Sequence, residues 1–188
     1  MFRYFFMTAL IFINLFWQVS QAQTLMTLGT GFHFSIHKAH SRAFEIMWHF
    51  DKSASTSLLI AFDTNSDGQF KGQEKRDLIR MLMQFEAQDY LLKLKYNDKT
   101  FRPESIRVVS LDVNNGLVSV SFGVLLDEPI NLQTSGLSLA FVGTNQVAVE
   151  QDSVKSLLTG MLAQNCDVKV LENSALDSHN WHRVYCTK

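Results

Sequence analysis

The stretch DTNSDGQFKGQE, residues 63 to 74, has the residue types and spacing of a calcium-binding loop. In the loop of an EF-hand, oxygen ligands come from positions 1, 3, 5, 7 and 12, and position 6 is a glycine that permits the sharp turn. Here the glycine is Gly68, and the ligand positions hold Asp63, Asn65, Asp67, Gln69 and Glu74. The spacing predicts a calcium site. The alternative is an aspartate-rich turn whose carboxylates cap backbone amides without an ion.

Three histidines in GFHFSIHKAH (31 to 40) form a second set of candidate ligands. If this stretch is extended, His33 and His37 lie on the same face, because side chains in a strand repeat every two residues. His40 follows in the next turn, and three imidazoles would suit nickel, copper or zinc. The alternative is a set of solvated side chains without a metal.

Two cysteines, Cys166 and Cys186, are too few and too far apart for a zinc knuckle or a CxxC redox site. In an oxidising compartment we expect them to form one disulfide. The alternative is a pair of buried free thiols.

The elements around the loop are predicted from apolar spacing. Helices are expected at 53–62 and 74–85 on either side of it, with a strand before them at 43–50. A hairpin is expected at 108–126, because Asn115 and Gly116 favour a type I′ turn. That turn would pair Val113 with Val118, Leu111 with Val120 and Val109 with Phe122, with all six side chains on one face.

Further strands are predicted at 90–97, 137–142, 146–151, 167–171 and 181–186, with a short helix near 153–163. The expected fold class is therefore α+β, a mostly antiparallel sheet with an inserted helix–calcium loop–helix unit.

The first 22 residues have the pattern of a secretory signal: one positive charge at Arg3, an apolar stretch, and small residues at Ser20 and Ala22. The apolar stretch is shorter than the roughly 20 residues that a spanning helix needs. We expect a signal peptide at 1–22 and a single domain at 23–188, located in the periplasm or secreted, with no membrane span after removal of the signal. The formal net charge is −1 without a long run of one sign, so we expect no nucleic-acid partner.

The run from Trp48 to Glu74 resembles a family of exported bacterial proteins of unknown function, labelled the periplasmic component of an uncharacterised ABC-type transport system. The residues that carry the resemblance are Trp48, Phe50, Asp51, Ser53, Asp63, Asn65, Asp67, Gly68 and Glu74. The resemblance implies an EF-hand-like loop, a membrane transporter as partner, and a role in handling nickel or cobalt. The chain departs from the family pattern at 31–40, where the usual His-Pro-His motif is absent.

These observations predict an exported accessory or binding protein of a transport system, with calcium as a structural ion. A first alternative is a periplasmic carrier for nickel, cobalt or zinc that uses the N-terminal histidines, and a second is an interaction module that binds no metal. An enzyme is not expected, because the chain has no GxSxG elbow, HExxH motif or phosphate-binding glycine loop.

Overall fold

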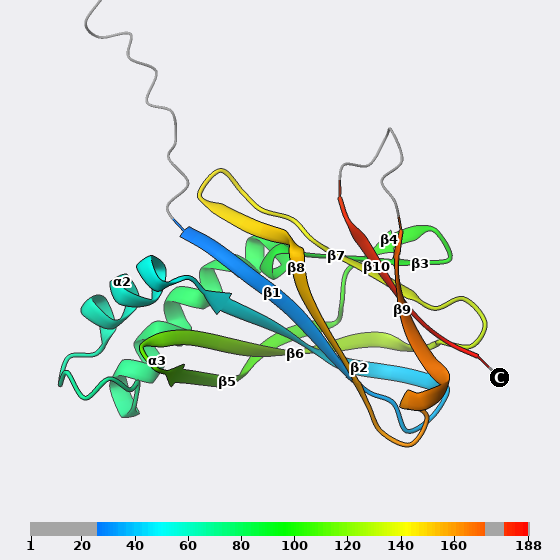
Figure 1. The fold of residues 1–188 in the computed structure, drawn as a ribbon, viewed down its shortest axis with the longest axis horizontal. Helices are drawn as coiled ribbons and strands as arrows, with labels where there is room; N and C mark the ends of the chain where they lie inside the picture. The colour runs from blue at the N-terminus through cyan, green and yellow to red at the C-terminus, as the bar shows by residue number, and fades with distance from the viewer. Residues whose placement is uncertain (1–25, 172–178, 188) are drawn as a thin grey trace, which may run out of the picture.

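A computed structural model describes residues 26–171 and 179–187, which form two five-stranded sheets and two α-helices (Figure 1). Sheet A has the strand order β5-β6-β2-β1-β8. It is mixed, because β1 and β8 are parallel while the other three pairs of neighbouring strands are antiparallel. Its strands are β1 (Met26–Ser35), β2 (His40–Phe50), β5 (Ser105–Asn114), β6 (Leu117–Asn131) and β8 (Val147–Thr159).

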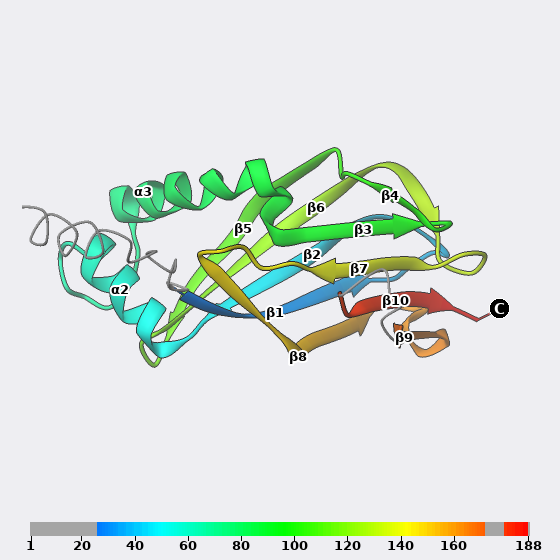
Figure 2. The ribbon, with the colours of Figure 1, turned by 90° about the horizontal axis from the view of Figure 1, so that it is seen from above.

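Sheet B has the order β4-β3-β7-β10-β9, and all of its pairings are antiparallel. Seen from above, sheet B lies over one end of sheet A, and the helices lie at the other end (Figure 2). The strands of sheet B are β3 (Leu92–Tyr96), β4 (Lys99–Phe101), β7 (Leu137–Phe141), β9 (Cys166–Leu171) and β10 (Trp181–Cys186).

The two helices are α2 (Lys52–Phe62) and α3 (Gly72–Leu82), and a side-chain cap explains where α2 begins. The carboxylate of Asp51 accepts a hydrogen bond from the Ala54 amide and caps α2. Leu78 and Leu82, four residues apart on α3, are fully buried. Two 3₁₀ helices follow later in the chain, η1 (Met83–Leu91) and η2 (Ala163–Asn165).

One hydrophobic core joins both sheets and the helices. Alternate residues of sheet A point into it, as a sheet with one covered face requires. The indole of Trp48 lies near the centre of this core, with its ring in contact with the rings of Phe85, Tyr90 and Phe122. The core side of β2 and β6 consists of Phe44, Ile46, Trp48, Phe50, Val118, Val120, Phe122, Val124 and Leu126.

The predicted α+β class is wrong: the described residues are mostly β, arranged as two sheets of which one is mixed. Two α-helices are described, joined by residues 63–71, and their arrangement does not by itself establish a calcium-binding helix–loop–helix unit. The periodicity of each segment by itself underestimates the strands, because it does not show how remote segments pair.

The predicted helix near 153–163 is also wrong, because residues up to Thr159 continue β8. Val154, Leu157, Leu158 and Met161 are spaced as on one face of a helix, which explains the expectation. In the structure this segment pairs with β1 from Gly31 to Ser35, and strand pairing across the sheet overrides the local pattern.

The hairpin at 108–126 forms, and the predicted pairs of Val113 with Val118 and Leu111 with Val120 are present. The third predicted pair is wrong. A register shift between Val108 and Ser110 places Val108 opposite Phe122, so Val109 turns to the outer face and is 57% exposed.

Residues 1–22 lie outside the described residues, and the signal peptide stays a prediction.

Candidate functional site

The loop at 63–74 lies between α2 and α3, at the end of the molecule away from sheet B (Figure 2). Its position is held by Ser55 of α2, whose hydroxyl donates to the carbonyl of Phe50 and accepts from the amide of Val118. These buried hydrogen bonds connect the helix before the loop to β2 and to the β5–β6 hairpin.

The first half of the loop is a series of turns closed by side chains. One carboxylate oxygen of Asp63 accepts from the Gly68 amide at 2.8 Å, and the other accepts from the Asp67 amide at 3.1 Å. The side-chain oxygen of Asn65 also accepts from the Asp67 amide, and Asp67 accepts from the Gln69 amide. Gly68 has a φ of +76°, which a residue with a side chain rarely adopts.

Glu74 closes the loop and is buried. Its Oε1 accepts from the Thr64 hydroxyl at 2.7 Å and from the amides of Thr64 and Asn65, and its Oε2 accepts from the Lys71 amide. The hydrogen bond from the Thr64 hydroxyl, with those from the amides, lowers the pKa of Glu74 because it favours the ionised carboxylate. Glu74 thus ties the start of the loop to the start of α3.

Lys71 stands at position 9 of the loop and was not among the residues predicted for the site. Its ammonium lies 2.8 Å from Asp67 Oδ2. This hydrogen bond lowers the pKa of the Asp67 carboxyl and raises the pKa of Lys71. Position 9 of an EF-hand often contributes a ligand through water. A lysine there instead places a positive charge among the loop's carboxylates.

The donor set of the loop fits calcium in kind, since it offers carboxylate and amide oxygens from Asp63, Asn65, Asp67 and Glu74. The side-chain amide of Gln69 donates to the carbonyl of Val113, which leaves the Gln69 backbone carbonyl for the role that position 7 has in EF-hands. Within residues 26–171 and 179–187, no three His, Cys, Asp or Glu side chains are gathered as a metal site.

Two of the three predicted histidine ligands, His33 and His37, each lie within hydrogen-bond distance of a different hydroxyl. His33 in β1 has Nε2 2.7 Å from the Thr159 hydroxyl and Nδ1 3.7 Å from a carboxylate oxygen of Glu45. His37 lies after the end of β1, with Nε2 3.1 Å from the Ser35 hydroxyl, and His40 begins β2. A transition-metal site built from His33, His37 and His40 stays a prediction.

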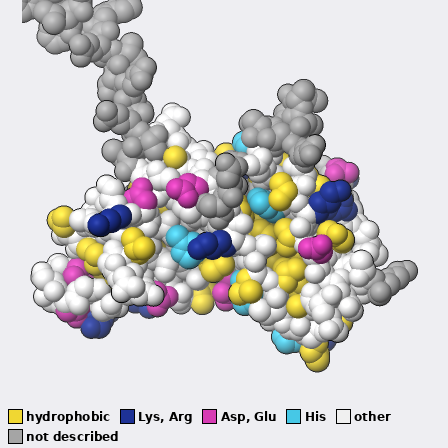
Figure 3. Space-filling model, viewed as in Figure 1, with side chains coloured by type: hydrophobic (Ala, Val, Ile, Leu, Met, Phe, Trp, Pro, Cys, Tyr) yellow, Lys and Arg dark blue, Asp and Glu magenta, His cyan; other side chains and the backbone are white. Residues whose placement is uncertain are grey.

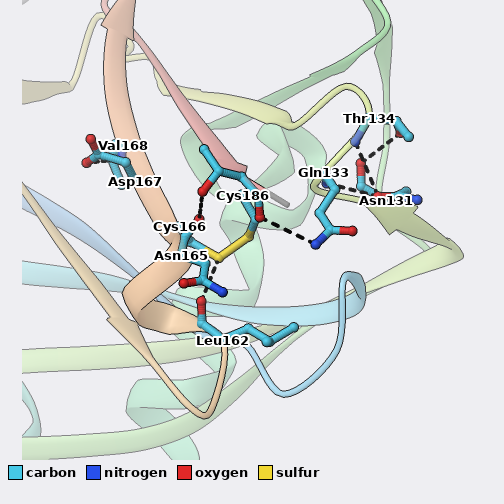
Figure 4. Close-up of a disulfide and its surroundings, with 10 residues drawn as sticks. Asn131, Gln133, Thr134, Leu162, Asn165, Cys166, Asp167, Val168 and Cys186 are labelled. Atoms are coloured by element: carbon cyan, nitrogen blue, oxygen red, sulfur yellow. Dashed lines mark hydrogen bonds between the residues drawn. A yellow bond between two sulfur atoms is a disulfide. The ribbon is translucent and has the colours of Figure 1, made fainter.

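The predicted disulfide between Cys166 and Cys186 is confirmed. The two cysteines stand opposite each other in β9 and β10, where the bridge joins paired strands (Figure 4). Thr187, just after the bridge, donates to the Asn165 carbonyl, and its own carbonyl accepts from the Gln133 side chain. The bridge thus fastens the edge strand β9 to β10, its neighbour in sheet B.

A comparison with family models gives a match over residues 28–182 to a family described as "Protein of unknown function (DUF1007)". The chain belongs to this family. The match supports the coarser part of the resemblance found in the sequence, a family of unknown function, and its description mentions neither a calcium loop nor a transporter. A comparison with curated proteins found no match.

The surface and the helices bear on the predicted partners. On the face shown in Figure 3, the side chains of Lys and Arg are scattered among those of Asp and Glu and form no patch of one sign. No described helix has the length and apolar character needed to cross a bilayer. The expected absence of an enzymatic activity stays a prediction.

Proposed function

We propose that this protein is an exported accessory or binding protein of a transport system, located in the periplasm or secreted, whose loop at 63–74 binds calcium as a structural ion. The observation that carries the calcium proposal is the burial of the Glu74 carboxylate against the start of the loop. This closing residue of the loop is only 8% exposed, and its ionised carboxylate faces the loop's first residues. A bound calcium would supply positive charge to the carboxylates of Asp63, Asp67 and Glu74.

The transport proposal is supported by the signal-like residues 1–22 and by the resemblance over Trp48 to Glu74. A membrane transporter is the proposed partner. If export occurs, the mass of the protein recovered from outside the cytoplasm should correspond to a chain that begins after Ala22. Recovery of only the full-length chain would contradict the export proposal.

The calcium proposal is tested by melting protein that has been stripped with a chelator. An ion that binds only the folded state raises the free energy of unfolding by about 2.7 kcal/mol at 100 times its dissociation constant. Calcium should therefore raise the melting temperature, and magnesium should do so less, because it prefers a tighter octahedral shell. Equal melting with and without millimolar calcium would reject the proposal.

Glu74→Gln keeps the shape of the closing side chain and removes its charge, so the variant should respond little to calcium. Glu86→Gln is the matched control, because Glu86 is exposed on η1 outside the loop.

Elemental analysis of protein purified without chelator separates the alternatives. Calcium supports the proposal, nickel, cobalt or zinc supports a carrier that uses the histidines, and no metal supports an interaction module.

A further inference from the structure

The outer face of sheet A, turned away from the core, carries a solvent-open groove of about 620 Å³. This volume is within the range of roughly 300–1,000 Å³ that small-molecule sites occupy. Four neighbouring strands, β1, β2, β6 and β5, supply its lining. The groove is separate from the loop at 63–74, which contributes no residue to it.

The strand register aligns the polar residues of the groove in one row across the sheet. His33 stands opposite Glu45, Glu45 opposite Gly123, and Gly123 opposite Arg107. Residues directly opposite each other in paired strands project from the same face. Across the sheet the row therefore presents the imidazole of His33, the carboxylate of Glu45, no side chain at Gly123, and the guanidinium of Arg107.

Gly123 makes the hollow between the two charged residues. The next row along the strands places Ala43 and Ser105 on either side of Leu125, so two of its three side chains are small. A Cβ added at Gly123 would come within 3.0 Å of Val109, which the register shift in β5 has turned to this face. Space above the glycine is thus bounded by Val109 on one side.

The charges on either side of the hollow do not neutralise each other. Glu45 and Arg107 are two strand spacings apart, about 9.5 Å between backbones. Among the described residues the side chain of Arg107 has no hydrogen bond or ion pair, and a carboxylate oxygen of Glu45 lies 3.7 Å from Nδ1 of His33. Glu104 at the rim is different, because it pairs with Arg42 at 3.1 Å. One positive and one negative group are therefore available to a ligand.

We propose that this groove binds a small zwitterion of amino-acid or dipeptide size, with its carboxylate at Arg107 and its ammonium at Glu45. A singly charged anion or cation would meet a like charge at one end. The two residues stand two strands apart, so a ligand with a few bonds between its charged ends has the scale needed to make charge-assisted hydrogen bonds with both. The proposal goes beyond the proposed function, because it rests on the groove and not on the loop or on export.

The test is a calorimetric titration with glycine, β-alanine and glycylglycine, which differ in the spacing of their charges. Acetate and methylammonium are the matched probes with a single charge. Calcium is kept saturating, so that the state of the loop does not vary. We expect saturable binding of at least one zwitterion at millimolar concentration or below, and at least tenfold weaker binding of both single-charge probes.

Arg107→Gln and Glu45→Gln should each weaken binding of that zwitterion at least tenfold, which is about 1.4 kcal/mol. Lys99→Gln and Glu128→Gln are controls with the same changes in charge at exposed positions outside the groove, and should bind normally. Absence of saturable binding by every zwitterion, acetate binding as tightly as the zwitterion, or equal losses in the controls would each overturn the proposal. Loss of calcium-dependent stabilisation alone would leave it standing.

Discussion

The ring of Phe32 in sheet A meets the imidazole of His182 in sheet B edge to face, with 6.1 Å between the ring centroids. The contact lies between the two sheets, and both side chains are buried. Nε2 of His182 has no hydrogen-bond partner within the described residues. Burial lowers the pKa of His182, because a charged imidazolium would lose its hydration there.

Stability should therefore fall as the pH drops below the ordinary histidine pKa of about 6.5. A lowered pKa means that the unfolded chain binds more protons than the folded chain. The contribution of His182 to the free energy of unfolding is therefore present above about pH 6.5 and is lost as the pH falls through the folded-state pKa. His182→Phe should flatten the decline between about pH 7.5 and 5.5. Urea unfolding at several pH values in this range measures the free energy of unfolding of both proteins.

A second histidine contributes in the same direction, because burial and, secondarily, the charge of Lys155 lower the pKa of His49. Part of the slope should therefore remain in His182→Phe. His40→Gln is the control for replacing a histidine at an exposed position, the start of β2. Identical slopes for wild type and His182→Phe would contradict the prediction.

Gly31→Ala should destabilise the protein by about 1–3 kcal/mol through overpacking. A Cβ at Gly31 would come within 2.8 Å of the backbone carbonyl oxygen of Lys155, in the parallel neighbour β8. Gly29→Ala is the matched control in the same strand, because a Cβ there has ordinary contacts of 3.6 Å or more. Its unfolding free energy should change little, and equal losses for both variants would refute the steric argument.

Removal of the disulfide by Cys166→Ala with Cys186→Ala should lower the free energy of unfolding by about 3 kcal/mol, since the bridge closes a loop of about twenty residues. Reductant should lower the stability of the wild type to that of the double variant and leave the double variant unchanged. Thiol labelling of the denatured, non-reduced wild type should be negligible. Labelling of both cysteines would show that the bridge does not form.

Lys71→Gln should strengthen calcium binding about two- to fivefold, because the ammonium beside Asp67 would no longer compete with the ion. Without calcium, the same variant should be slightly less stable, as Asp67 loses its partner. Lys75→Gln on α3 is the charge-matched control. The measurement is a calcium titration, and unchanged affinity in Lys71→Gln would mean that the lysine does not compete.

Features that depend on neighbours in the chain followed from the sequence. Asn115 and Gly116 define the turn of the β5–β6 hairpin, and the nearest cross-strand pairs then follow by counting. The spacing from Asp63 to Glu74 placed the turns of the loop and its closing carboxylate, because these contacts span twelve residues or fewer. Two cysteines allow only one internal pairing, so the disulfide could also be predicted from the sequence.

The two-sheet architecture and the groove were decided by the tertiary structure. Apolar residues from Val154 to Met161 have helical spacing, yet the segment up to Thr159 is a strand because β1, more than a hundred residues earlier, offers a parallel edge. The row that places Glu45, Gly123 and Arg107 side by side depends on two strand registers and on the shift that turns Val109 outward. Such pairings set distances between segments remote in the chain, and local periodicity carries no information about them.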